Sequence, residues 1–426
     1  NYTLTGGTHN FTVNRRVVGV SGTRLYDATT NAVASDLATH ANLVGSQTLS
    51  LSGTGTIASK NVGSNKTVSI GTLALGDGTN GGLAANYTLT GGTHQLTVNQ
   101  RPLNATLARQ YDATTTAAGS TLSSFDALQG GENLTMTGSG TAASKNVANG
   151  IAMSSNGNLA LADGTGSASN YSLNSTVINI SQRVLSSSGS KTYDANTNAL
   201  ASAITLSNLA STETINHSGT ALTSSANAGS YTISNLSGIT IADGTNGGLA
   251  SNYTLTGGTH NFTVNRRVVG VSGTRLYDAT TNAVASDLST HANLVGSQTL
   301  TLSGTGTIAS KNVGSNKTVS IGSLSLADGS NGGLAANYTL TGGTHQLTVN
   351  QRPLNATLAR QYDATTTSAG STLSSFDALQ GGENLTMTGS GTAASKNVAN
   401  GIAMSSNGNL ALADGTGSAS NYSLNS

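Results

Sequence analysis

The sequence predicts a mainly β protein, a linear rod of tandem modules of about 84 residues each. Short segments alternate between apolar and polar residues, as in Gln95-Leu96-Thr97-Val98-Asn99, and this period is typical of a half-buried strand. Two motifs also return at nearly constant spacing along the whole chain. Identical units without a singular site are typical of a spacer or scaffold rather than of an enzyme.

The two motifs supply the candidate structural residues of the repeat. The first motif is Tyr-Asp-Ala-(Thr/Asn)-Thr, and its tyrosine and aspartate pairs are Tyr26 and Asp27, Tyr111 and Asp112, Tyr193 and Asp194, Tyr277 and Asp278, and Tyr362 and Asp363. The second motif is Asn-Tyr-(Thr/Ser)-Leu, with its tyrosine at Tyr2, Tyr87, Tyr171, Tyr253, Tyr338 and Tyr422.

The motif spacing divides the chain into five modules. Residues 1–15 are expected to form the last strand of a preceding module. The modules are then residues 16–100 (module 1), 101–182 (module 2), 183–266 (module 3), 267–351 (module 4) and 352–426 (module 5, truncated). Because the chain opens and closes within a repeat, it reads as a window on a longer protein.

The repeat has a second level. Residues 1–175 return as residues 252–426 with seven differences, so three unlike modules form a cassette of 251 residues. Dissimilar neighbours reduce the exchange of strands between adjacent domains. Unequal recombination that copied three modules by chance explains the same pattern.

Composition narrows the class of protein. Charged residues make up 8% of the chain, against roughly 25% in an average globular domain. The net charge of +1, without a basic cluster, excludes a nucleic-acid binder. No apolar stretch is long enough to predict membrane insertion by this segment. The absence of cysteine fits a chain that crosses a narrow pore unfolded, or one with a cytosolic history.

Module 1 illustrates the expected elements. A strand is predicted over residues 16–25, followed by a turn in which Asp27 accepts a backbone N–H two residues on and Tyr26 buries its ring with its hydroxyl paired. Residues 34–43 are expected to form a short helix or turn. Further strands are predicted over residues 48–53, 67–75 and 87–99, with a glycine-rich loop over residues 76–82. Both an immunoglobulin-like sandwich and a β-grasp-like unit with one short helix fit this order.

The boundary between modules 1 and 2 has no linker. The predicted strand ending at Asn99 passes through Gln100-Arg101-Pro102 directly into the next strand. Strands that run through the junctions predict a stiff rod. With roughly 30 to 40 Å for each compact module, five modules would reach about 150 to 200 Å.

The motifs resemble a known family. Tyr-Asp-Ala-Thr-Thr, the segment Gly53–Gly63 and the segment Leu83–Leu89 are similar to the YDG-type, or MBG-type, repeats of large bacterial adhesins. Module 3 departs from the pattern, with Ser224–Ala228 where Ser-Lys-Asn-Val is expected.

This resemblance implies a secreted stalk. It implies export by a two-partner pathway, as for filamentous-haemagglutinin-like proteins, with an outer-membrane transporter or anchor as a partner. It also implies an extracellular location on a Gram-negative cell surface and in the biofilm matrix. The adhesive partner, an extracellular polysaccharide or a neighbouring cell surface, would be met by regions outside this segment.

The sequence disfavours two further kinds of chemistry, a covalent crosslink and a calcium site. Lysine and asparagine are adjacent at Lys60, Lys145, Lys311 and Lys396, but neighbouring residues of a strand point to opposite faces, which disfavours a Lys–Asn crosslink. Calcium needs several carboxylates, and each Asp-Gly loop, at Asp77, Asp163, Asp243, Asp328 and Asp414, brings one.

The histidines show no metal-ligand spacing. His9, His94, His260 and His345 recur in the last strand of their modules and are expected to be exposed or junction residues. No serine lies in a nucleophile elbow. The sequence therefore predicts no catalytic, cofactor-binding or metal-binding residue.

Two functions stay open at this point. In the first, the array is a spacer that holds an adhesive tip away from the cell. In the second, its flanks bind polysaccharide weakly at many sites. The scarcity of aromatic residues, at 4% of the chain, favours the spacer. Ice binding would need a regular lattice of threonines, which a unit of this length with loops does not provide.

Overall fold

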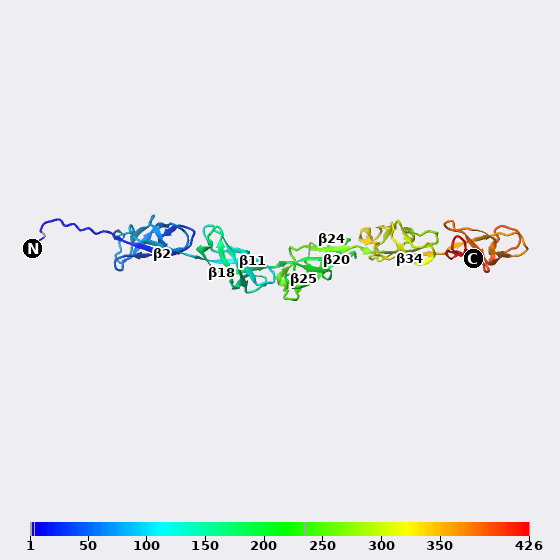
Figure 1. Ribbon diagram of the computed structural model, residues 1–426, viewed down its shortest axis with the longest axis horizontal. Helices are drawn as coiled ribbons and strands as arrows, with labels where there is room; N and C mark the ends of the chain where they lie inside the picture. Colours follow the sequence, from blue (N-terminus) through cyan, green and yellow to red (C-terminus); the bar gives the residue numbers. More distant parts are fainter. Residues whose placement is uncertain (1, 4, 234–235, 426) are drawn as a thin grey trace. The chain divides into compact units, whose positions relative to one another are not determined.

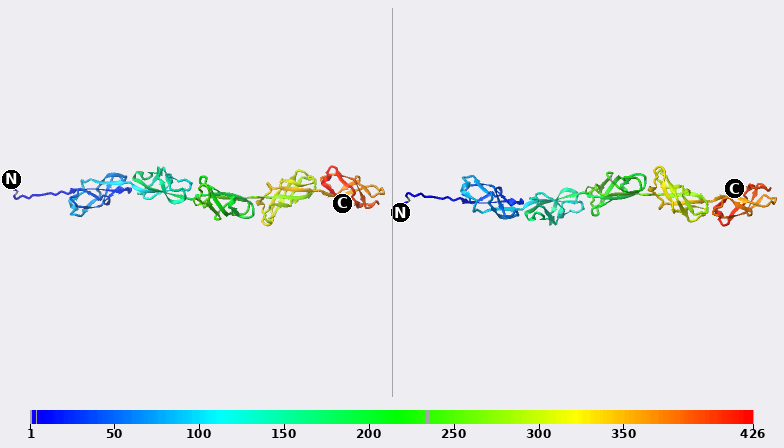
Figure 2. Two further views of the ribbon diagram at one scale, coloured as in Figure 1. Left: turned by 90° about the horizontal axis from the view of Figure 1, so that it is seen from below. Right: turned by 90° about the horizontal axis from the view of Figure 1, so that it is seen from above.

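The computed structural model describes residues 2–3, 5–233 and 236–425, and they form a mainly β structure (Figures 1 and 2). Every helical segment in this part of the chain is a 3-10 turn of three residues. These turns are η1 (Ala34–Asp36), η2 (Ala84–Asn86), η3 (Gly119–Thr121), η4 (Ala168–Asn170), η5 (Ala201–Ala203), η6 (Ala250–Asn252), η7 (Ala285–Asp287), η8 (Ala335–Asn337), η9 (Gly370–Thr372) and η10 (Ala419–Asn421).

The strands are short and follow a similar order in each module. Module 1 contains β1 (Arg16–Val17), β2 (Gly19–Leu25), β3 (Asn31–Val33), β4 (Thr39–Ala41), β5 (Leu49–Ser52), β6 (Thr54–Ile57), β7 (Gly63–Ser69), β8 (Ala74–Asp77), β9 (Tyr87–Thr88) and β10 (His94–Asn99). Module 2 contains β11 (Arg101–Gln110), β12 (Thr116–Ala118), β13 (Leu122–Phe125), β14 (Leu134–Thr137), β15 (Ser139–Ala142), β16 (Ala148–Ser155), β17 (Ala160–Asp163) and β18 (Tyr171–Ser181). Module 3 contains β19 (Arg183–Val184), β20 (Ser186–Thr192), β21 (Asn198–Leu200), β22 (Ile204–Ser207), β23 (Ile215–Leu222), β24 (Gly229–Thr232), β25 (Ile239–Asp243), β26 (Tyr253–Thr254) and β27 (His260–Asn265).

Modules 4 and 5 repeat the pattern of modules 1 and 2. Module 4 contains β28 (Arg267–Val268), β29 (Gly270–Leu276), β30 (Asn282–Val284), β31 (Thr290–Ala292), β32 (Leu300–Ser303), β33 (Thr305–Ile308), β34 (Gly314–Ser320), β35 (Ser325–Asp328), β36 (Tyr338–Thr339) and β37 (His345–Asn350). Module 5 contains β38 (Arg352–Leu354), β39 (Ala356–Leu358), β40 (Thr367–Ala369), β41 (Leu373–Phe376), β42 (Leu385–Thr388), β43 (Ser390–Ala393), β44 (Met404–Ser406), β45 (Ala411–Asp414) and β46 (Tyr422–Leu424).

The chain divides into two compact units, and the division runs through module 3. The first unit holds Asn1–Leu185, Asn208–Asn216 and Ala242–Gly257, and the second holds Ser186–Ser207, His217–Ile241 and Gly258–Ser426. All contacts between modules that are described below lie inside one unit.

A parallel pair of strands lies at the centre of the main sheet of module 1. The sheet has the order β3-β6-β7-β10-β2-β4. The first long strand, β2, pairs in parallel with the last strand, β10, and each has an antiparallel neighbour on its other side, β4 and β7. Of the two folds predicted, the β-grasp-like unit has this central parallel pair of first and last strands. The expected short helix is only the 3-10 turn η1.

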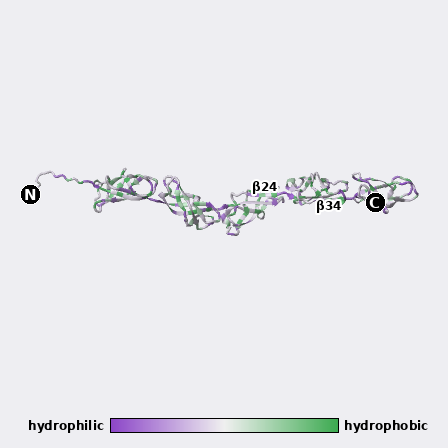
Figure 3. Ribbon diagram, in the orientation of Figure 1, coloured by the Kyte–Doolittle hydropathy of each residue, from purple (hydrophilic) through white to green (hydrophobic). Residues whose placement is uncertain are grey.

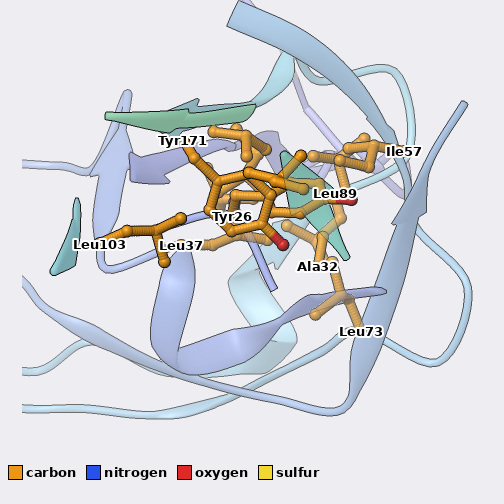
Figure 4. Packing of buried hydrophobic residues seen from close by; sticks show 13 residues of the cluster. Tyr26, Ala32, Leu37, Ile57, Leu73, Leu89, Leu103 and Tyr171 are labelled. Atoms are coloured by element: carbon orange, nitrogen blue, oxygen red, sulfur yellow. The ribbon is translucent and has the colours of Figure 1, made fainter. Parts of the chain in front are cut away.

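The core follows from the alternation along the strands. In β10 the residues alternate between buried and half-buried, which places Leu96 and Val98 inside. Figure 4 shows Tyr26 and Tyr171 packed among aliphatic side chains, including Leu37 and Leu89. Hydrophobic residues are interspersed with hydrophilic ones in every module (Figure 3).

The predicted strands over residues 67–75 and 87–99 differ from the observed ones. The first is two strands, β7 and β8, separated by a turn at Gly71, whose φ of 55° lies in the left-handed region that favours glycine. The second is interrupted between β9 and β10 by a turn at Gly91, with a φ of 84°. Each glycine forms a tight turn that ends one strand before the next begins, and the two strands then pair with different neighbours.

Strands follow each other across the module boundaries with one residue between them, close to the predicted junction. Gln100 separates β10 from β11, and Gln182 separates β18 from β19. The predicted strand over residues 1–15 is not present in the described part of that segment. The equivalent strand β10 pairs with β2 and β7, and the described residues include no counterparts of these two strands for residues 1–15.

Candidate functional site: the junction between modules

The tyrosine of the first motif packs against the tyrosine of the second motif in the following module. Tyr26 of module 1 and Tyr171 of module 2 lie edge to face, with ring centroids 5.2 Å apart and an interplanar angle of 77°. This geometry is favourable for aromatic pairs. The same arrangement joins Tyr111 to Tyr253, Tyr193 to Tyr338, and Tyr277 to Tyr422, with centroids 5.3 to 5.5 Å apart.

A glutamate of the following module lies against each pair at three of these junctions. At junction 1–2, Glu132 accepts hydrogen bonds from the hydroxyls of Tyr26, at 2.6 Å, and Tyr171, at 2.9 Å. Lys60 of module 1 completes the cluster, with its Nζ 2.5 Å from Oε1 of Glu132. The same Nζ lies 5.9 Å from the centroid of the Tyr26 ring.

Junctions 2–3 and 4–5 repeat this cluster. Glu213 accepts from Tyr111 at 2.7 Å and from Tyr253 at 2.6 Å, and Lys145 lies 2.8 Å away. The corresponding cluster of junction 4–5 consists of Tyr277, Tyr422, Lys311 and Glu383. Glu132, Glu213 and Glu383 are all the glutamates of the sequence, so every glutamate serves a junction.

Electrostatics explain how a buried carboxylate is held charged. Burial raises the pKa of Glu132, but hydrogen bonds from Lys60, Tyr26 and Tyr171 together outweigh it, so that the pKa lies below its ordinary value. Burial and the neighbouring carboxylate raise the pKa of Tyr171 to about 12. At neutral pH the glutamate is therefore ionised and both hydroxyls are protonated donors.

An asparagine and an arginine of the following module bind the backbone of the preceding one. Asn170, the last residue of η4, accepts the N–H of Val62 at 2.9 Å and donates through Nδ2 to Oδ1 of Asn61 at 3.1 Å. Nε of Arg101 donates to the carbonyl oxygen of Tyr26 at 2.6 Å. These bonds fix the preceding backbone beside the tyrosine pair.

Junction 3–4 keeps the tyrosine pair and changes the charges. Gln298 stands where the other junctions have glutamate; its Oε1 accepts from Tyr338 at 2.5 Å and its Nε2 donates to Tyr193 at 3.0 Å. Asn227 and Asn337 bond as at the other junctions, which places Ala226 in the position of the lysine. This junction is therefore neutral.

The first junction asparagine and the last motif tyrosine of the given sequence are more exposed than their equivalents. Asn170, Asn252, Asn337 and Asn421, which contact the preceding module, are at most 1% exposed, whereas the equivalent Asn86, for which the described residues include no such partner, is exposed. Tyr362 is 60% exposed, against 3% or less for its four equivalents. The described residues contain neither a partner for Tyr362 from a following module nor a counterpart of β18 between β39 and β44. Burial of the asparagine thus depends on the preceding module, and burial of the tyrosine depends on the chain that follows it.

The predicted turn aspartates act within their own modules. Oδ1 of Asp27 accepts the N–H of Thr29 at 2.9 Å, as expected for an Asx turn, and Asp27 forms an ion pair with Arg24. Asp112, Asp194, Asp278 and Asp363 form the same kind of turn with a basic residue three positions earlier. Tyr87 is buried with Val18 and Leu49 of its own module.

Other candidate residues have structural partners. Lys60 bonds to Glu132 rather than to Asn61, and the loop carboxylate of Asp77 accepts the N–H of Ala84 at 2.8 Å. The expectation that His94 is exposed is wrong, because its imidazole accepts the N–H of Val20 and bonds to a carbonyl oxygen in its own module. His260 and His345 are buried as well. In the described part of the chain, no three histidine or carboxylate side chains gather as metal ligands would.

Sequence reasoning missed the glutamates. Glu132 lies 21 residues after Tyr111, Glu383 lies 21 residues after Tyr362 and Glu213 lies 20 residues after Tyr193, a nearly constant offset that could have singled them out. The offset alone does not reveal that the glutamate serves the tyrosine of the preceding module. That pairing depends on how consecutive modules meet.

The family comparison agrees with the repeat. The YDG domain model matches residues 10–96, 93–178, 180–260, 263–347 and 344–426. The chain therefore belongs to the YDG domain family, as an array of five domains. Among curated proteins, none matches the chain. Over the described residues, no helix has the length and apolar character needed to cross a membrane.

Proposed function

We propose that this array is a structural stalk of a secreted bacterial adhesin, which extends an adhesive tip from the cell surface in cell–cell or biofilm-matrix adhesion. The observation that carries the proposal is the position of the recurring motif tyrosines at the contacts between modules. In each of the four junctions, the motif tyrosine is buried against the next module. A repeat whose defining side chain joins modules is suited to building length.

The buried ionisable groups also support a structural role. The carboxylates with lowered pKa at the junctions, such as Glu132, are saturated by donors from two modules. A catalytic carboxylate needs access to substrate, and Glu132 has only 8% of its side chain exposed. The chain is therefore proposed to be non-enzymatic.

The location and partners belong to the same proposal. An extracellular position on a Gram-negative cell, export by two-partner secretion, an outer-membrane transporter or anchor, and a matrix adhesin such as CdrA all rest on the resemblance of the motifs. A polysaccharide or a neighbouring cell would be contacted by regions outside this segment.

Multivalent binding of matrix polysaccharide is the competing function. Sugar sites are commonly lined by aromatic faces, and Tyr26, Tyr111, Tyr193 and Tyr277 are at most 3% exposed. The side chains best suited to stack on sugar rings are thus unavailable in the joined array, which favours the spacer.

Excision of one cassette separates the two functions. Removal of Tyr26 through Leu276 deletes 251 residues and joins Leu25 to Tyr277, in the same local sequence as before. For a spacer, neither the full chain nor the shortened chain should bind purified matrix polysaccharide in a pull-down assay. Binding by the full chain that drops sharply after excision would instead show avidity from many weak sites and overturn the proposal.

A further inference from the structure

Two positions at the junctions change together. The preceding module supplies Lys60, Lys145, Ala226 or Lys311, and the following module supplies, in the same order, Glu132, Glu213, Gln298 or Glu383. Lysine always faces glutamate. The single junction without the lysine is the single described junction without the glutamate.

The two partners differ in their access to water. The side chains of Glu132, Glu213 and Glu383 are 2% to 8% exposed, whereas those of Lys60, Lys145 and Lys311 are 34% to 42% exposed. A lysine that loses its partner can turn its ammonium group into solvent. A glutamate that loses its partner stays buried as an uncompensated charge, which is costly.

Glutamine satisfies the same tyrosines without a cation. At junction 3–4, the amide of Gln298 both donates to Tyr193 and accepts from Tyr338. The hydroxyl of Tyr193 accepts from Nε2 of Gln298 at 3.0 Å and also donates to Oε1 at the longer distance of 3.4 Å, whereas the hydroxyl of the equivalent Tyr111 only donates, to Glu213. A following module with glutamine in place of the glutamate therefore needs no lysine from the preceding module.

The remaining charge near the cluster does not distinguish the junctions. An arginine of the following module bonds the carbonyl oxygen of the motif tyrosine at every junction, and these arginines are Arg101, Arg183, Arg267 and Arg352. Because the arginine is constant, the difference lies in the lysine and glutamate positions.

We propose that these two positions form a one-way rule for which modules can be neighbours: a module with the buried glutamate requires a predecessor with the lysine, whereas a module with glutamine accepts either predecessor. Module 3, with Ala226, can then be followed only by a glutamine module, and module 4 is one. Module 1 carries Gln47 at the same position and shares this property.

The rule can be tested at junction 3–4 of the whole chain. The reporter is the N–H of Ala228, which donates to Oδ1 of Asn337 at 2.7 Å across the junction. Residues around Ala228 occur once in the sequence, so that hydrogen exchange measured on peptides reports this junction alone. The protection factor of the amide measures local opening.

Three variants give distinct expectations at pH 7. Gln298→Glu, facing Ala226, should lower the protection of Ala228 at least about tenfold. Ala226→Lys alone should change it less than about threefold, because the new side chain can reach solvent. In the double variant, the protection factor of Ala228 should return to within about threefold of its value in the unmodified chain.

The control is the N–H of Tyr193, which bonds to Asn265 within module 3. It should keep its protection in all three variants, which shows that the module is folded. Full protection of the Ala228 amide in Gln298→Glu would overturn the rule. A double variant in which this amide is protected as little as in Gln298→Glu would also overturn it.

Junction 2–3 supplies the converse test. Lys145→Ala leaves Glu213 without its cation, whereas Glu213→Gln reproduces the amide of junction 3–4. The rule predicts a larger loss of protection at the N–H of Val147, assigned by NMR, for Lys145→Ala than for Glu213→Gln. Equal losses, or the opposite order, would contradict it.

Discussion

The hydroxyl of Tyr26 donates to the carboxylate of Glu132, 106 residues further along the chain and in the next module, at 2.6 Å. The most regular residue of the repeat is thus satisfied by a neighbour rather than by its own module. A single module leaves this tyrosine without its carboxylate and that carboxylate without its lysine. The cluster around each motif tyrosine is therefore complete only in a pair of modules.

Removal of a junction tyrosine should separate two modules. Tyr111→Ala deletes a fully buried ring and should cost about 3 to 5 kcal/mol in the stability of junction 2–3. The loss would be read from hydrogen exchange at the N–H of Val147, which bonds to Asn252. Tyr362→Ala is the matched control, because this ring is 60% exposed, and its cost should be below about 1 kcal/mol. Equal costs would show that burial of the ring at the junction is not the source of the loss.

The junction asparagine gives a second matched pair. Asn252 is fully buried and bonds both Val147 and Asn146, so Asn252→Ala should cost about 1 to 3 kcal/mol, since it leaves a buried N–H unsatisfied. Asn86 is the exposed equivalent, and Asn86→Ala should change the free energy of unfolding by less than about 0.5 kcal/mol. Denaturant unfolding of the two variants tests this difference, and a costly Asn86→Ala would contradict it.

The sequence predicts the modules well because their signals are local. The alternation in residues 95–99 and the Asx turn at Asp27 depend only on neighbouring residues, and both are found. The burial of Tyr26 and the pairing of its hydroxyl were also expected, but the partner was not. Nothing local in the sequence indicates that the partner comes from the next module.

Other differences have similar causes. His94 looks polar and exposed in an isolated strand, yet the parallel pairing of β10 with β2 places its ring against the N–H of Val20. The short strands β3, β4 and β6 were not predicted, because three or four residues carry too little alternation to be recognised. Long-range pairing decides these elements.

Acid should weaken the charged junctions and spare the neutral one. Hydrogen bonds outweigh burial and hold the pKa of Glu213 below its ordinary value. The stability that the ionised carboxylate gives to junction 2–3 is therefore complete above the pKa of an unfolded glutamate, about 4.3. This stability is lost as the pH falls through the lower pKa of the folded chain. By NMR, the protection of Val147 should fall in this range while that of Ala228, beside Gln298, changes less. An equal fall at both amides would show that the glutamate is not responsible.

The third residue of the first motif should offer a stabilising substitution. Ala195 has a φ of 64°, in the left-handed region, and its side chain is exposed. Ala195→Gly should therefore stabilise module 3 by about 1 kcal/mol through relief of backbone strain. Ala28→Gly should gain less, because the methyl group of Ala28 packs in the core cluster beside Tyr26. Hydrogen exchange at the N–H of Tyr193 measures the first effect, and a loss of protection there would refute the strain argument.

Small-angle scattering tests the central claim that interlocked junctions make the array a stiff spacer. The full chain has five modules, and the chain without Tyr26–Leu276 has two. If the junctions hold, the maximum dimension should increase linearly, by about 30 to 40 Å for each module. A dimension that instead grows roughly as the square root of module number, as for beads on flexible linkers, would contradict the account.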